Sequence, residues 1–184
     1  TGLITTRGFE DAANIMRGVG RATGEPPENV FKIAEIDKPD PIIPQDLTYG
    51  IPERIDKHGN VVVPLDEEAT RKAVRELVKE GVEAIAVCLM WSFYNPDHEK
   101  RVTEIIEEEA PDVYVSASHE VSPSLGEYER TVGTAINSKV GPETESYIAS
   151  TESELKERYD FEEPFLMMQA NGGNTPAHLA AETP

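Results

Sequence analysis

The sequence predicts an α/β domain, and three observations lead to that class. Short, β-rich apolar runs alternate along the chain with segments of helical period. The longest apolar run, residues 84–91, has the length of a buried strand and falls far short of the roughly 20 apolar residues that cross a bilayer. With 184 residues, 38% of them hydrophobic and 28% charged, the chain can also build one sizeable core.

The first third of the chain is expected to form a strand, a helix and a long irregular excursion. Residues 2–6 are predicted as a short strand, and residues 9–17 as a helix. Glycines and prolines recur from 18 to 45, and loops of this length are usually functional or mobile. β-rich runs flank the Gly-containing turn at 56–60, which predicts a hairpin.

The middle of the chain is the most regular part. Asp66 is expected to cap a helix that continues to about Gly81. Residues 82–89 are apolar with β-branched content, so they are predicted as a central strand covered on both faces. Asn95 and Pro96 predict the next helix start, with Asn as the cap and Pro at the first helical position.

The last third is predicted to be mainly helical. A strand at 112–116 precedes a segment of helical period that begins at Ser122-Pro123 and reaches about residue 159. Gly141-Pro142 indicates a bend or a break into two helices within this segment. Residues 165–168 are predicted as the last strand, and Thr175-Pro176 as the start of the final helix.

These elements divide the chain into three expected parts. Residues 18–63 form a loop and hairpin excursion, and residues 64–121 form an α/β segment. Residues 122–184 contain helices, a strand and an Asn-Gly-Gly turn. The order of strands and helices is that of a single α/β architecture, without an internal repeat.

The charge balance excludes some partners. Asp and Glu number 35 against 17 Lys and Arg, which gives a net charge of −18. This charge repels phosphate backbones and anionic lipid headgroups, so neither nucleic acid nor a membrane surface is an expected partner. A highly hydrated surface explains the excess, and adaptation to high salt is an alternative explanation.

The single cysteine and the first residues bear on the compartment. Cys88 lies inside an apolar run, so its thiol is expected to be buried and inert, and a lone cysteine fits a reducing cytoplasm. Residues 1–4 have neither the charged start nor the long apolar run of a secretory signal. The chain begins without Met in strand-like sequence, which indicates an internal piece of a longer polypeptide.

The helix predicted after Ser122 carries the first set of candidate site residues. An apolar stripe, from Leu125 to Val140, accompanies a second stripe of small polar residues. Small polar groups suit a helix where something packs closely or a ligand needs hydrogen-bond partners, although a solvated face or a simple Glu127–Arg130 pair also explains them. The candidates for substrate binding here are Glu127, Arg130, Thr131 and Asn137.

A second candidate lies where the last predicted strand ends. A strand, an Asn-Gly-Gly sequence and a helix start together give a geometry that can hold an anion or a polar group. Ordinary turn chemistry is the competing interpretation. The candidate residues here are Gln169, Asn171, Gly172 and Gly173. The sequence contains no Walker loop, Gly-x-Gly-x-x-Gly, His-Glu-x-x-His or Cys-x-x-Cys, and its four histidines lack metal-like spacing.

Several stretches, in order over nearly the whole chain, resemble the hydantoinase A family of N-methylhydantoinases, 5-oxoprolinases and related subunits of acetone and acetophenone carboxylases. The stretches are Leu-Ile-Thr-Thr-Arg-Gly-Phe-Glu-Asp (3–11), Ile-Pro-Glu-Arg-Ile with its turn (51–60), Pro-Leu-Asp-Glu-Glu (64–68), Gly-Val-Glu-Ala-Ile-Ala-Val-Cys-Leu (81–89), Asn-Pro-x-His-Glu (95–99), Glu-Tyr-Glu-Arg-Thr (127–131), Asn-x-x-Val-Gly-Pro (137–142) and Met-Gln-x-Asn-Gly-Gly (168–173).

The resemblance implies a fragment of an actin- and sugar-kinase-like fold, whose ribonuclease-H-like lobes close on ATP, with an inserted β-hairpin and α/β segment. Family members use ATP to activate an amide or lactam carbonyl, or a carboxylation substrate, by phosphorylation. The full-length protein would therefore use ATP and Mg²⁺ on a lactam or hydantoin, with a hydantoinase B-like subunit as a possible partner.

The family's glycine-rich phosphate loops are not in this sequence, which the resemblance places between them. The fragment alone is therefore expected to bind no cofactor or metal and to be inactive. Two alternatives stay open: a fragment of an ATP-dependent acetone- or acetophenone-type carboxylase subunit, and a module that docks another subunit without catalysis.

Overall fold

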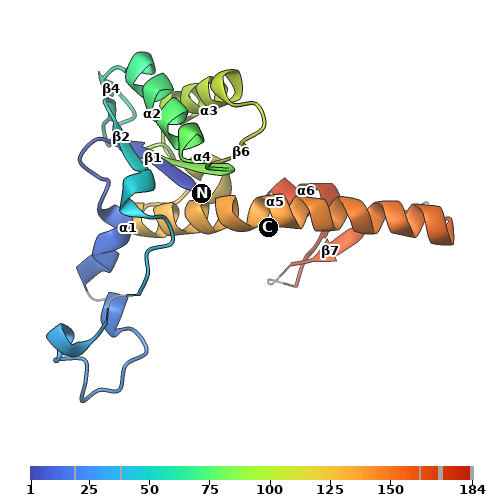
Figure 1. The fold of residues 1–184 in the computed structure, drawn as a ribbon, viewed down its shortest axis with the longest axis horizontal. Helices are drawn as coiled ribbons and strands as arrows, with labels where there is room; N and C mark the ends of the chain where they lie inside the picture. Colours follow the sequence, from blue (N-terminus) through green and yellow to red (C-terminus); the bar gives the residue numbers. More distant parts are fainter. Residues whose placement is uncertain (19, 38, 162, 170–171, 183–184) are drawn as a thin grey trace.

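A four-stranded parallel sheet organises the first two thirds of the chain (Figure 1). The computed structural model describes residues 1–18, 20–37, 39–161, 163–169 and 172–182. Helices α2 and α3 cover one face of the sheet, and the long helix α5 covers the other. The result is a mixed α/β fold with three layers around a central parallel sheet.

The strand order in the main sheet is β2-β1-β5-β6, and every neighbouring pair is parallel. Two small antiparallel hairpins, β3–β4 and β7–β8, lie outside it. The strands are β1 Gly2–Thr6, β2 Thr48–Ile51, β3 Arg54–Ile55, β4 Val61–Val63, β5 Ala84–Cys88, β6 Tyr114–Ala117, β7 Leu166–Met168 and β8 Asn174–Pro176.

The helices differ greatly in length, and α5 is the longest by far (Figure 1). They are α1 Ala12–Ile15, α2 Glu67–Lys79, α3 Asp97–Glu109, α4 Ser118–Val121, α5 Glu127–Tyr159 and α6 Ala177–Glu182. No helix in the described ranges has both the length and the apolar character needed to cross a membrane.

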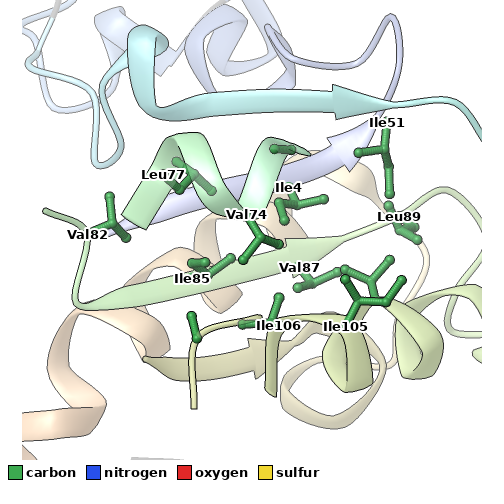
Figure 2. Packing of buried hydrophobic residues seen from close by; sticks show 13 residues of the cluster. Ile4, Ile51, Val74, Leu77, Val82, Ile85, Val87, Leu89, Ile105 and Ile106 are labelled. Atoms are coloured by element: carbon green, nitrogen blue, oxygen red, sulfur yellow. The ribbon is translucent and has the colours of Figure 1, made fainter. Parts of the chain in front are cut away.

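Strand β5 is the centre of the core, as the sequence predicted. It pairs with β1 on one side and β6 on the other, and all of its residues are buried. Alternate side chains serve the two faces: Ile85 and Val87 join the cluster under α2 and α3, while Ala86 and Cys88 face α5. Figure 2 shows the first cluster, where Val74 and Leu77 of α2 meet the sheet and α3.

The ends of α2 follow the local rules that predicted them. The Asp66 carboxylate accepts a hydrogen bond from the backbone N–H of Ala69 at 2.9 Å, and Gly81 stops the helix with φ +76°. Helix α3 begins one residue later than predicted. Pro96 is its cap residue, while the Asn95 side chain accepts from the N–H of Asp97 at 3.0 Å.

Three other predictions about the elements needed correction. The helix at 9–17 reduces to α1, because Met16 and Arg17 take positive φ values of 51° and 55° that end the α-helical path. Thr175-Pro176 does not start the final helix, because both residues belong to β8 and α6 begins at Ala177. Ser122-Pro123 does not start the long helix, which begins at Glu127 after Gly126, whose φ is +123°.

Helix α5 continues through Gly141-Pro142 without the predicted break into two helices. Gly141 is required by a close approach: a Cβ added there would lie 2.4 Å from the Tyr114 ring of β6. The second half of α5 carries a small separate core, in which Ile148 packs with Ala177 and Ala180 of α6. The β7–β8 hairpin lies beside this half of the helix (Figure 1).

Candidate functional site

Buried polar side chains gather at the carboxyl edge of the main sheet, where β1, β5 and β6 end. In open parallel sheets this edge, and above all the point where the strand order reverses, is the usual place for a ligand. The reversal here lies between β1 and β5, because the chain passes from β1 to β2 on one side before it adds β5 on the other. The buried polar residues near this edge are Thr5, Thr6, Glu53, Ser92, His98, Glu99, Ser118 and Arg130.

We call these buried polar residues the edge site. Its first group is the buried pair of Glu53 and His98. The Glu53 carboxylate, whose side chain is fully buried, lies 2.8 Å from Nδ1 of His98 and also accepts from the Thr6 hydroxyl. The Thr6 oxygen in turn accepts from the backbone N–H of Met90 at 2.9 Å. This chain of hydrogen bonds ties the end of β1 to the segment that follows β5.

The second buried carboxylate is that of Glu99, which directly follows His98 in α3. One of its oxygens accepts from the Leu89 N–H and the Ser118 hydroxyl, both at 2.7 Å. The other lies 2.8 Å from Nδ1 of His119 and accepts from the backbone N–H of the same residue at 2.9 Å. With these partners the carboxylate is held in place, since charge-assisted hydrogen bonds are stronger than neutral ones.

Arg130 brings a fully buried guanidinium from α5 to the same place. Nη1 donates to the Ser92 hydroxyl at 2.7 Å, and Nη2 donates to the Leu89 carbonyl at 2.9 Å. The cation also lies 5.1 Å from the ring centroid of Phe93. The Ser92 and Ser118 hydroxyls, 3.1 Å apart, link this cation to the Glu99 carboxylate.

The turn from Leu89 to Phe93 is therefore fixed from two sides. Glu99 holds the N–H of Leu89, and Arg130 holds its carbonyl. Within the turn Trp91 has φ +61°, a left-handed conformation that a bulky residue rarely adopts, and its ring lies 5.5 Å from that of Phe93. Backbone strain of this kind persists where the surroundings impose it, and it concentrates at functional sites.

The chemical group best placed for proton transfer here is His119. Its Nδ1 is oriented by Glu99, and its Nε2 is buried without a hydrogen-bond partner in the described structure, 3.7 Å from the Glu120 carboxylate. Cys88 is not such a group, since burial raises the pKa of its thiol. No set of three or more His, Cys, Asp or Glu side chains within the described ranges is arranged to hold a metal ion.

Of the site residues predicted on α5, three are buried beneath the sheet. Thr131 belongs to the polar stripe, and Arg130 and Asn137 lie beside it. This face of α5 packs against β5 and β6, while the apolar Ile136 and Val140 are exposed. The solvated-face explanation of the polar stripe is therefore wrong, and close packing explains its small residues. Arg130 uses Ser92 and Leu89 as partners, and the half-buried Glu127 precedes it at the first turn of α5.

The second predicted set does not join the edge site. Gln169, Gly172 and Gly173 form the turn of the β7–β8 hairpin, where the N–H of Gln169 donates to Gly173 and the N–H of Gly172 donates to Gln169. Asn171 lies outside the described residues. The hairpin packs near Ile148, which is 18 residues after Arg130, or roughly 27 Å along the helix at 1.5 Å per residue.

The sequence prediction did not include Glu53, Glu99 or His119 among the candidate site residues. A signal for Glu99 was nonetheless present, because it occupies the buried stripe of α3 at helical spacing from Val102 and Ile106. A charged residue on an apolar stripe requires buried partners. Glu53 had no comparable signal, since its partner His98 lies 45 residues away.

A parallel α/β sheet with buried polar groups at its carboxyl edge has the architecture of the open α/β domains in which ligands bind at that edge. The family described as the hydantoinase/oxoprolinase N-terminal region matches residues 1–110. The chain belongs to this family.

Two curated relatives of this chain are themselves described as enzyme subunits. It is 41% identical to the acetophenone carboxylase gamma subunit of Aromatoleum aromaticum, over 94% of this chain and 24% of that protein. It is 32% identical to the caprolactamase subunit alpha of Pseudomonas jessenii, over 98% of this chain and 25% of that protein. The chain thus spans about a quarter of the length of these relatives.

A solved structure agrees with the fold. The nucleotide-free structure of acetone carboxylase superposes with a TM-score of 0.86 at 31% identity, covering 96% of this chain and 25% of that one. This likeness extends over α5 and the C-terminal hairpin as well as the main sheet, because nearly the whole chain is aligned.

Proposed function

We propose that this chain is part of an ATP-dependent enzyme that opens a cyclic amide of the hydantoin or 5-oxoproline type. The observation that carries the proposal is the alignment with caprolactamase, a relative described as ATP-dependent, over nearly the whole chain. The buried edge site supports it, because this fixed polar site lies within the segment that aligns with caprolactamase. In this proposal the 184 residues alone are inactive.

A second candidate is an ATP-dependent ketone carboxylase, and the 41% identity to acetophenone carboxylase favours it. The relatives are named as subunits, which supports a partner such as a hydantoinase B-like subunit. A segment that only docks such a partner is the non-catalytic alternative. The single buried cysteine supports a cytoplasmic location for any of the three.

The residues of this chain have a positioning role in the proposal. Glu99 and Arg130 hold the Leu89–Phe93 turn at the carboxyl edge, and His119 is the group that we propose to exchange a proton through Nε2. Among the described residues no three His, Cys, Asp or Glu side chains are arranged to hold a metal ion, and the proposal assigns no step through ATP or Mg²⁺ to this segment. The actin-like lobe remains a proposal for the fold of the full-length protein.

The test is ADP release by the full-length protein with 5-oxoproline, hydantoin and acetone as rival substrates. Release that depends on 5-oxoproline or hydantoin supports the cyclic-amide proposal, whereas release that requires acetone and bicarbonate supports the carboxylase. No stimulation by any of them, or by acetophenone with bicarbonate, would contradict both. The 184-residue chain serves as the control and is expected to release no ADP.

A further inference from the structure

A groove runs along the outer edge of β6, beside α5 (Figure 1). The order of the main sheet ends with β6, which is therefore an edge strand. Two adjoining hollows of about 490 and 770 Å³ make up this β6 groove, and both have Tyr114 and Glu145 in their walls. Pockets of about 300–1,000 Å³ hold drug-sized ligands, so the groove has room for a peptide segment.

The backbone of β6 has hydrogen-bonding groups at this edge. The N–H of Tyr114 donates to the Glu83 carbonyl at 3.0 Å, so the backbone groups of Tyr114 point toward β5. Because backbone groups alternate sides along a strand, those of Val115 point to the outer edge, as does the N–H of Ala117. Within the described ranges no strand pairs with this edge. A free strand edge of this kind is a template for another strand.

The walls of the β6 groove are acidic. Glu83 and Asp112 line one of its hollows, Glu120 lines the other, and Glu145 of α5 lines both. Among the described residues that line the groove, none is Lys or Arg. Glu83, Asp112 and Glu145 make no ion pair in the described part of the chain, unlike the carboxylates at the end of α3. Unpaired carboxylates along one groove attract cations.

We infer that the β6 groove binds an extended segment of a second polypeptide, which adds a strand to β6 and carries lysine or arginine at alternate positions. Alternate side chains of an added strand face α5, where such cations meet Glu145. A second copy of this chain does not fit, because its net charge is also −18. Only the choice of a partner subunit as the second polypeptide rests on the proposed function, since the free edge and its charges belong to this chain.

Three peptides test the inference with the 184-residue chain. The first alternates lysine and valine over seven residues, and the second has glutamate in place of lysine. The third has the sequence of the first, but every backbone nitrogen is methylated, so it has no backbone N–H to donate. We expect the first peptide to shift the amide NMR signals of Val115 and Ala117 and to slow hydrogen exchange at Val115. The other two should bind at least ~10-fold more weakly.

Substitutions in the chain separate strand addition from general attraction to an acidic protein. Val115→Pro removes an outward N–H, a change that an edge strand tolerates, and should weaken the lysine peptide at least ~10-fold. Glu145→Lys should weaken it by ~3-fold or more. Glu68→Lys makes the same charge change on α2, which contacts β2 at the other edge of the sheet, and should leave binding unchanged. If Val115→Pro fails to fold, the methylated peptide makes the same test from the ligand's side.

The outcomes distinguish the occupant and keep the inference apart from the proposed function. Equal binding of the methylated peptide, or equal weakening by Glu68→Lys and Glu145→Lys, would show non-specific attraction and overturn the inference. Binding to the 184-residue chain but not to the full-length protein would mean that the protein's own polypeptide covers β6, which overturns a second polypeptide as the occupant. If the lysine peptide binds both but the full-length protein releases no ADP with any substrate, the β6 groove stands and the proposed function fails.

Discussion

Helix α3 has charged side chains at both ends, and the two ends place them in opposite environments. At its first turn, Glu99 is fully buried and held by donors from Leu89, just after β5, and from the first residues of α4. At its last turn, Glu108 and Glu109 pair at the surface with Arg71 and Arg75 of α2. Surface pairs of this kind contribute little each, whereas breaking a buried charge network is costly.

The comparison shows what each network can do for the molecule. The buried network fixes a geometry, because Glu99 and Arg130 together hold the N–H and the carbonyl of Leu89 at the carboxyl edge of the sheet. The surface one joins two neighbouring helices and responds to pH and salt, since its charges stay in contact with water. Substitutions that remove one charge at a time can separate these roles.

The largest effect is expected for Glu99→Gln. The amide cannot accept all of the hydrogen bonds that Glu99 receives, and its NH₂ would face the backbone N–H of Leu89 or His119. We expect a loss of about 3 kcal/mol in the free energy of unfolding, measured by urea denaturation. Glu107→Gln, at an exposed position of α3, should cost less than about 0.5 kcal/mol. Equal costs would mean that the buried network does not hold the fold.

Arg130→Met should have the next largest effect. The substitution removes the donor to the Ser92 hydroxyl and one of the two donors to the Leu89 carbonyl, which keeps its hydrogen bond from Ser92, so about 2 kcal/mol of stability should be lost. Because two serine hydroxyls link Arg130 to Glu99, the double variant should cost less than the sum of the single ones by about 1 kcal/mol. Strict additivity in urea denaturation would show that the two charges act independently.

The hydrogen-bonded pair of Asn137 and Ser116 is buried and uncharged, and its loss should cost less stability than the loss of a buried charge but more than the loss of a surface charge. Asn137 donates from Nδ2 to the Ser116 hydroxyl of β6 at 2.9 Å. Asn137→Ala should cost about 1 kcal/mol in thermal or urea unfolding. If Asn137 instead binds substrate, as the sequence suggested, the full-length protein would lose affinity for substrate while stability stays within about 0.5 kcal/mol of the unchanged chain.

The helices and strands were predicted from the sequence more accurately than the site residues. Helices and strands depend on residues close together in the sequence, whereas the site depends on contacts between residues far apart in it. The cap at Asp66 and the all-buried strand β5 depend on neighbours a few residues away or on one apolar run, so local rules sufficed. Arg130 finds its acceptor 41 residues earlier in the chain, at Leu89. Such a pairing is visible only once the sheet and α5 are assembled.

The face of helix α5 that packs against the sheet could not be predicted from the sequence for the same reason. Its apolar and polar stripes were both visible in the sequence, but the usual rule would place the apolar stripe inside. The structure buries Arg130, Thr134 and Ser138 and leaves Ile136 exposed. The rule fails because β5 presents small side chains and hydrogen-bonding partners to the helix, including the Cys88 thiol and the Leu89 carbonyl.

The smallest effect is expected at the surface end of α3, and it should depend on pH. Hydrogen bonds from Arg75 and then Arg71 lower the pKa of Glu109 from 4.5 to about 2. Arg71 lowers the pKa of Glu108 in the same way. Because these pKa values are lower in the folded chain, the stabilisation is fully present above about pH 4.5 and is lost as the pH falls towards 2.

Glu109→Gln tests how much the surface ion pairs between α2 and α3 contribute to stability. The unfolding temperature of the unchanged chain should fall more steeply between pH 4.5 and 2 than that of the variant, in which the titrating group is absent. Raising the salt concentration to about 1 M should reduce the difference, because it screens exposed charges. If Glu109→Gln matched Glu99→Gln in cost at neutral pH, the surface pairs would hold α2 and α3 together as firmly as the buried carboxylate holds the turn.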